Sequence, residues 1–79
     1  MNKPVSITWT LGDRLAKALR LAGKANNDMA IVLGVSRNTV GNYIADRTPI
    51  RAGALRLWSE ETGVPVEWLK YGDEPRPPV

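Results

Sequence analysis

The sequence contains no cysteine, no histidine and no phenylalanine among its 79 residues. A disulfide scaffold and a zinc site built from cysteine or histidine are therefore excluded. Catalysis through a cysteine nucleophile or a histidine base is excluded on the same ground. The longest apolar run has only five residues, Met29 to Leu33, which is too short to cross a bilayer. No apolar segment of the secretory type follows the first lysine, so we expect a cytoplasmic protein.

The acidic residues do not suggest an active site either. Glu60 and Glu61 are adjacent in the sequence, and Asp73 and Glu74 lie near its end, so no two carboxylates are expected to converge as an acid–base pair. The chain is also short for a pocket that encloses a small substrate. We therefore expect a protein that is not an enzyme and that needs no cofactor and no metal.

Composition and charge favour a small folded domain with an anionic partner. The chain is 43% apolar and 24% charged, which is typical of folded proteins, and its length allows one domain. The net charge of +3 is unevenly distributed. Residues 1–56 carry nine basic and three acidic side chains, a net of +6, whereas residues 57–79 carry two basic and five acidic ones, a net of −3. A basic front part favours binding of a polyanion.

The first 23 residues predict an arm followed by a helix. Apolar residues recur at helical spacing over residues 11–22, with Thr10 as the expected N-cap and Gly23 as the end. Residues 1–10 form an expected N-terminal arm, in which Val5, Ile7 and Trp9 alternate with polar residues. This alternation leaves open a strand shared between two subunits, but we favour a free arm because chain ends are commonly unpaired.

Four shorter helices are expected after this one. The second begins after Asn26 or Asn27 as N-cap and ends at Gly34, and the third is capped by Ser36 and runs to about residue 45. The fourth covers residues 51–62, with Gly63 behind it. Pro65 suits a first helical position, so the fifth runs from Val66 to Tyr71 and ends at Gly72. The expected fold is all-α: a compact five-helix bundle over residues 11–72, followed by a flexible tail at 73–79.

The core of this bundle should be modest, so dimerisation or a ligand would add to its stability. The residues that we expect to form it are Leu11, Leu15, Leu19, Met29, Ala30, Leu33, Val35, Val40, Ile44, Leu55, Trp58, Val64 and Leu69.

Residues 26–45 carry the features of a helix-turn-helix. Ala30 supplies a small residue where the two helices approach, and Gly34 allows the tight turn. Val35 follows as a buried apolar residue. Ser36 caps the second helix, whose apolar anchors are Val40 with Tyr43 or Ile44. The outer face of this second helix then presents Arg37, Asn38, Gly41 and Asn42, and arginine and asparagine side chains pair with guanine and adenine in the major groove.

Together with the distant segment GVPVEWLKYGDE, the motif LGVSRNTVGNY resembles the Cro/C1-type helix-turn-helix family of phage and bacterial repressors, which has the lambda-repressor-like fold. The resemblance covers about residues 10–74. It implies a DNA-binding domain without a cofactor, a homodimer at least on DNA, and a pseudo-palindromic operator in a bacterial nucleoid. It also implies base contacts from Ser36, Arg37, Asn38 and Asn42, and phosphate contacts from Asn26, Asn27, Arg47 and Arg51. We expect Lys24 to add to these phosphate contacts as a further basic side chain.

Some positions depart from the family pattern. Asn26 and Asn27 stand where relatives have a longer glutamine, and Gly41 lies inside the recognition helix, where a close approach of DNA or mere drift could account for it. Ile31 and Val32 occupy positions that are polar in most relatives. These two apolar residues keep an alternative open, an antitoxin or adaptor that uses the same fold to bind a protein. Our expected function is a phage or prophage Cro-like repressor that blocks a promoter through the helix at residues 36–45.

Overall fold

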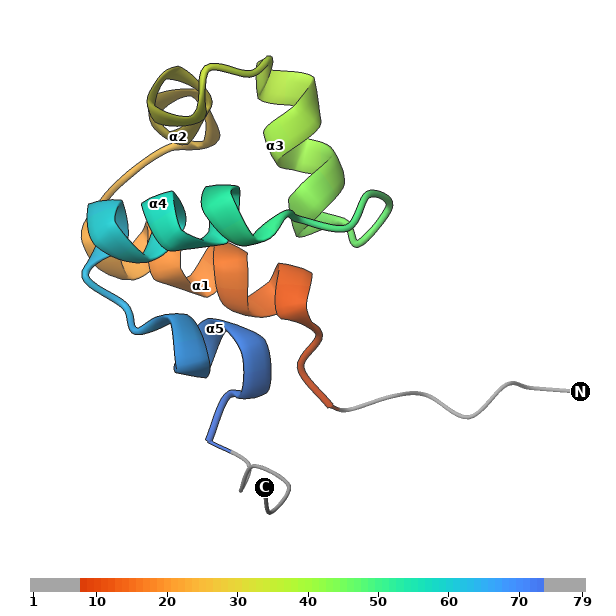
Figure 1. Cartoon of the computed structure of the whole chain (residues 1–79), viewed down its shortest axis with the longest axis vertical. Coiled ribbons are helices and arrows are strands. Elements are labelled where there is room, and N and C mark those ends of the chain that lie inside the picture. The colour runs from red at the N-terminus through yellow and green to blue at the C-terminus, as the bar shows by residue number, and fades with distance from the viewer. Residues whose placement is uncertain (1–7, 74–79) are drawn as a thin grey trace, which may run out of the picture.

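The structure, a computed structural model, describes residues 8–73 of the chain. Five helices follow one another in these residues: α1 (Leu11–Ala22), α2 (Asn26–Leu33), α3 (Arg37–Ile44), α4 (Ala52–Thr62) and α5 (Val66–Tyr71). The described part contains no strand, so the all-α expectation is confirmed. It also contains no helix that is long and apolar enough to span a membrane. Figure 1 shows α1 and α4 at the centre, with α2 and α3 on one side and α5 on the other.

The boundaries of α1 agree with the sequence prediction. The Thr10 side chain accepts a hydrogen bond from the Asp13 N–H at 3.1 Å, and the Asp13 carboxylate accepts one from the Thr10 N–H at 3.0 Å. This reciprocal capping box satisfies two backbone donors at the start of the helix. At the other end Gly23 adopts a left-handed conformation with φ 68°. The N–H of Lys24 then bonds the Leu19 carbonyl at 2.9 Å, which ends the helix.

The predicted cap of α2 is wrong. The N-cap is Ala25, and Asn26 and Asn27 are the first two residues of the helix, with no side-chain cap hydrogen bond. The Asp28 carboxylate instead accepts the Ala25 N–H at 2.8 Å. An acid in the first turn thus satisfies the end of the helix from inside it, where its charge also suits the helix dipole. The helix therefore begins one or two residues earlier than an asparagine cap would place it.

The helix α4 begins one residue later than predicted, whereas α5 covers the predicted residues. Arg51 and Pro65 stand at the N-cap positions of α4 and α5, and neither makes a side-chain cap. A shift of one residue at a helix end is within the usual ambiguity of such boundaries. Gly63 ends α4 with φ 75°, as expected, and Gly72 follows α5.

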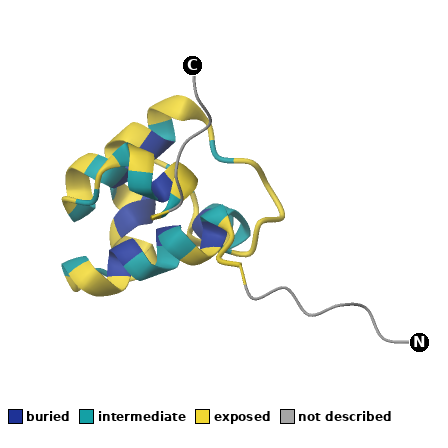
Figure 2. Ribbon diagram, turned by 90° about the horizontal axis from the view of Figure 1, so that it is seen from below, coloured by how far each residue is buried: buried dark blue, intermediate teal, exposed yellow. Residues whose placement is uncertain are grey.

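Nine side chains form the buried core, and Figure 2 marks the buried residues in dark blue along the helices. Eight of them were predicted, and Ala18 was missed. Trp58 is fully buried at its centre, and its indole N–H donates to the Leu15 carbonyl at 3.2 Å. The prediction was wrong for five residues that are only partly buried and pack against the core from outside: Leu11, Leu33, Val35, Ile44 and Val64. Each lies close to the end of a helix or in a joint, where one side of the residue stays open to solvent.

Arg14 connects α1 to α5 and to the segment that precedes α1. Its guanidinium donates to three backbone carbonyls: Leu69 at 2.8 Å, Lys70 at 2.7 Å and Trp9 at 2.8 Å. The planar fork of arginine suits such a set of acceptors. Two of these carbonyls belong to the last turn of α5, where a helix lacks internal donors and a cation is favourable. Arg14 therefore contributes to the docking of the short α5.

Candidate nucleic-acid interface

The turn between α2 and α3 has the expected geometry of a helix-turn-helix. Gly34 is left-handed, with φ 70° and ψ 33°. The Val35 N–H bonds the Ala30 carbonyl at 3.0 Å and the Gly34 N–H bonds the Ile31 carbonyl at 3.3 Å, a hydrogen-bonded pattern that ends a helix abruptly. Ala30 is buried, and α2 and α3 pack against each other. Figure 1 shows α2 end-on while α3 runs across the view, so the two helices diverge steeply.

Ser36 caps α3, as predicted. Its side-chain oxygen accepts the Thr39 N–H at 3.1 Å and lies 3.0 Å from the Thr39 hydroxyl. The hydroxyl is exposed, but its oxygen is already used by the helix. Thr39 was not among the predicted site residues, and it is the hydrogen-bond partner of Ser36 at the start of α3.

Of the remaining predicted base-reading residues, Asn38 and Asn42 lie on the side of α3 opposite Val40, and Arg37 is the first residue of the helix. Val40 is fully buried against the core, so the opposite side of the helix points outward. Asn38 and Asn42 are four residues apart and thus neighbours on that side. Arg37 and Asn38 are exposed and Asn42 is half-buried. None of these three side chains has a hydrogen-bond partner within residues 8–73 that would keep it from a ligand.

The C-terminal end of α3 is fixed to α1 by a residue that the sequence analysis missed. Asp46 has φ 59°, and its carboxylate accepts hydrogen bonds from the Thr10 hydroxyl at 2.6 Å and the Gly12 N–H at 2.9 Å. Gly12 permits this approach, because a Cβ there would lie 2.2 Å from the Ile44 carbonyl oxygen. An aspartate directly after a helix was the available signal, since aspartate tolerates the left-handed region.

The predicted phosphate-binding residues do not all lie together. Arg47 and Arg51 are both exposed and flank the loop from α3 to α4, next to the recognition helix. Asn26 and Asn27 are exposed at the start of α2. Lys24, in contrast, places its ammonium 3.5 Å from the Glu61 carboxylate near the end of α4. A half-exposed pair of this kind is weak, so it reduces the availability of Lys24 without abolishing it.

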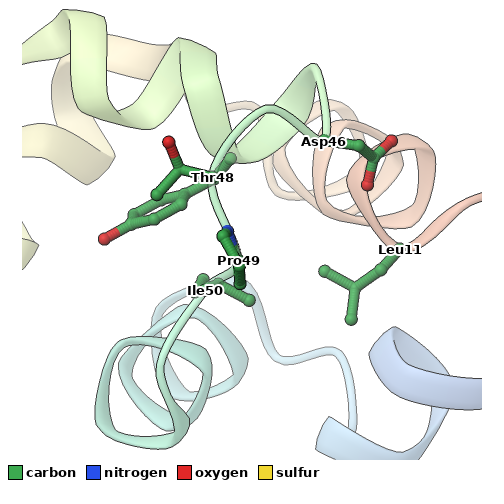
Figure 3. A pocket seen from close by; sticks show the side chains of 6 residues that line it. Leu11, Asp46, Thr48, Pro49 and Ile50 are labelled. Atoms are coloured by element: carbon green, nitrogen blue, oxygen red, sulfur yellow. The ribbon is translucent and has the colours of Figure 1, made fainter.

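A hollow of about 310 Å³ lies between the start of α1, the end of α3 and the loop that follows (Figure 3). Its lining residues are Leu11, Tyr43, Asp46, Thr48, Pro49 and Ile50. Leu11, Tyr43 and Ile50 also pack against the core. The loop that bears Arg47 is thus seated on the bundle at Ile50.

The two unusual apolar residues of α2 do not form an exposed pair. Ile31 is 73% exposed, whereas Val32 packs against the core. Only Ile31 therefore remains for a contact outside the described chain.

The comparisons with known proteins agree with this geometry. A family model described as a helix-turn-helix matches residues 14–69, more than half of the chain and all of α2, α3 and α4. No curated protein and no solved structure matches the chain.

Proposed function

The chain belongs to the Cro/C1-type helix-turn-helix family of DNA-binding regulators, and from that premise we propose that it regulates transcription by binding a specific duplex sequence. In this proposal α3 enters the major groove, which is wide enough for a helix. Arg37, Asn38 and Asn42 contact base edges there. Ser36 contributes at the start of the helix.

The observation that carries the proposal is the outer face of α3. Its three polar side chains have no internal partner among the described residues, while Val40, on the side that faces the core, is fully buried. One side of the helix is packed on the core, and the polar side chains outside it are free to form hydrogen bonds with a ligand. Arginine and asparagine provide the forked donors and acceptors that match guanine and adenine edges.

Phosphate contacts supply the affinity that does not depend on sequence. Arg47 and Arg51 are the strongest candidates, since both are exposed beside α3. The start of α2 would contact the neighbouring phosphates of the DNA through Asn26 and Asn27, and through Lys24 just before the helix. Lys24 has to leave Glu61 to do so.

The regulatory role extends this proposal. A chain of this kind, encoded by a phage or prophage and acting in a bacterial cytoplasm, would act as a Cro-like repressor that occupies a promoter. One copy of α3 offers few base contacts, so two copies on a pseudo-palindromic operator would give useful affinity. We therefore propose a homodimer, at least on DNA.

Selection from a random duplex library at physiological salt tests the proposal. We expect the retained duplexes to share an inverted repeat, with half-sites about one helical turn apart. Enrichment of a single half-site would contradict the dimer and leave the sequence-specific reader. No enrichment at all would overturn the proposed function.

A second candidate function is binding of a protein partner, and the 73% exposure of Ile31 on α2 favours it. The Arg37→Ala variant separates the two candidates. In a DNA-binding regulator this variant loses operator binding, whereas in an adaptor it keeps the partner. The matched variant is Ile31→Ala. It should keep operator binding in a DNA-binding regulator and weaken binding of the partner in an adaptor.

A further inference from the structure

The seven glycines of the chain can be sorted by what the fold requires of them. Four have positive φ values between 64° and 75° and follow the ends of helices, where other residues are strained. These are Gly23, Gly34, Gly63 and Gly72. Gly12 is required for packing, because a Cβ there would lie 2.2 Å from the Ile44 carbonyl oxygen. Each of these five positions is explained by the structure of the chain itself.

Gly53, in the exposed first turn of α4, and Gly41 belong to neither group, and of the two only Gly41 lies among the predicted base-reading residues. It lies inside α3 with an ordinary helical conformation, and a Cβ built on it would have nothing within 4 Å. Glycine is the least favourable residue for a helix interior apart from proline. Alanine would fit this position without any contact. Glycine therefore lowers the stability of the helix here, and no packing contact within the described residues requires it.

The neighbours of Gly41 are the residues assigned to base reading. Gly41 follows Arg37 by four positions and Asn38 by three, so all three share one side of α3. Asn42 is the next residue and is four positions from Asn38. The position without a side chain therefore lies among the three polar side chains that point outward, and it leaves a gap in the surface between them.

We infer that this gap, which we call the Gly41 gap, is the point where base edges of the duplex come closest to the backbone of α3. The inference rests on the proposed function and deepens it. Without a Cβ at position 41 the helix axis can lie nearer the floor of the major groove. A shorter distance between the helix and the base edges suits Asn38 and Asn42, because an asparagine side chain is one methylene shorter than that of glutamine. Gly41 is in this sense a specificity-determining residue that makes no hydrogen bond of its own.

The Gly41→Ala variant tests the inference, with thermal unfolding and binding measured on the same preparation. We expect Tm to rise by about 4–8 °C, because alanine is the better helix former and meets no neighbour. We expect affinity for the selected operator to fall about tenfold or more, since base contacts on both sides of the gap are disturbed. Affinity for random duplex should stay within about twofold, because phosphate contacts alone sustain it.

The matched control is Gly53→Ala in the first turn of α4, where a Cβ also has nothing within 4 Å. This variant should raise Tm and leave operator affinity within about twofold. The inference is overturned if Gly41→Ala keeps full operator affinity, if it weakens operator and random duplex equally, if its Tm falls, or if Gly53→Ala loses as much affinity. If the unmodified protein selects no operator, the proposed function fails instead, and the two failures are thereby distinguished.

Discussion

We expect single polar residues of this chain to matter either for binding or for the fold, and their contacts within the described residues distinguish the two. Asn42 has no partner within residues 8–73 and lies on the outer side of α3. Asp46, four residues later, is fully engaged with Thr10 and Gly12. Both are short polar residues at the same end of α3, yet substitution should affect binding in one case and stability in the other.

For Asn42→Ala we expect a cost of about 1–3 kcal/mol on the selected operator and a relaxed preference at one base pair. Thermal stability should not fall, because the amide makes no internal hydrogen bond that would be lost and alanine is the better helix former. Competition between operator variants with a single changed base pair measures the effect. Uniform weakening across all variants would show that Asn42 does not read a base.

For Asp46→Ala we expect the free energy of unfolding to fall by about 2–3 kcal/mol. Two hydrogen bonds to a carboxylate are lost, and alanine is strained at φ 59°. Asp46→Asn should cost about 1 kcal/mol, since asparagine keeps an acceptor and tolerates this conformation. Urea denaturation of the pair is the measurement. Equal losses in the two variants would contradict this account of the residue.

At the scale of helices, the sequence predicted what local chemistry determines and missed what distant segments determine. The bounds of α1 follow from Thr10, Asp13 and Gly23, which are all close in the sequence, and they were predicted correctly. The start of α2 was misplaced because Asp28 competes with two asparagines for the same local role. Nothing in the sequence around Arg14 indicates that it meets Leu69, 55 residues away.

The candidate site divides in the same way. The sequence was sufficient for the turn at Gly34 and the cap at Ser36, because both depend on the residue type at one position. It was also sufficient for the outward side of α3, which follows from helical spacing. The engagement of Lys24 by Glu61 depends on how α4 lies across the bundle, and no pattern near residue 24 reveals it. The core was overestimated at Leu11 and Ile44 because periodicity gives the side of a helix but not its depth.

The helix that depends most on a distant side chain is α5, and Arg14→Lys tests that dependence. Lysine keeps the charge but cannot reproduce the fork that reaches three carbonyls. We expect amide hydrogens of α5 to exchange at least about tenfold faster, with α3 unchanged. The control is Arg20→Lys, at an exposed position of the same α1. Equal protection of α5 in both variants would contradict the role of Arg14.

At the scale of the whole molecule, the first part of the sequence is net basic and the last part is net acidic. Residues 1–56 carry +6 and residues 57–79 carry −3. The acidic part includes Glu61, which already holds Lys24. Arg47 and Arg51, in the loop beside α3, form no ion pair with any acidic residue in the described part of the chain. We expect this uneven charge to favour the approach of a polyanion before any base is read.

For Arg51→Ala we expect weaker binding to every duplex alike, and a reduction of the salt dependence by about 0.9 for the one phosphate contact removed. The logarithm of the binding constant plotted against that of the salt concentration gives this slope. Arg56→Ala, at an exposed position further along α4, provides a comparison. An unchanged slope in Arg51→Ala would remove this residue from the phosphate contacts.

The contacts of Arg14 have a topological consequence. One guanidinium reaches the carbonyl of Trp9, at the start of the described chain, and those of Leu69 and Lys70, near its end. The two ends of the folded domain therefore lie next to each other, on either side of this one side chain. Circular permutants, with the old ends joined and new ends opened at the exposed Gly63 joint, should thus keep the same bundle and leave the face of α3 unbroken.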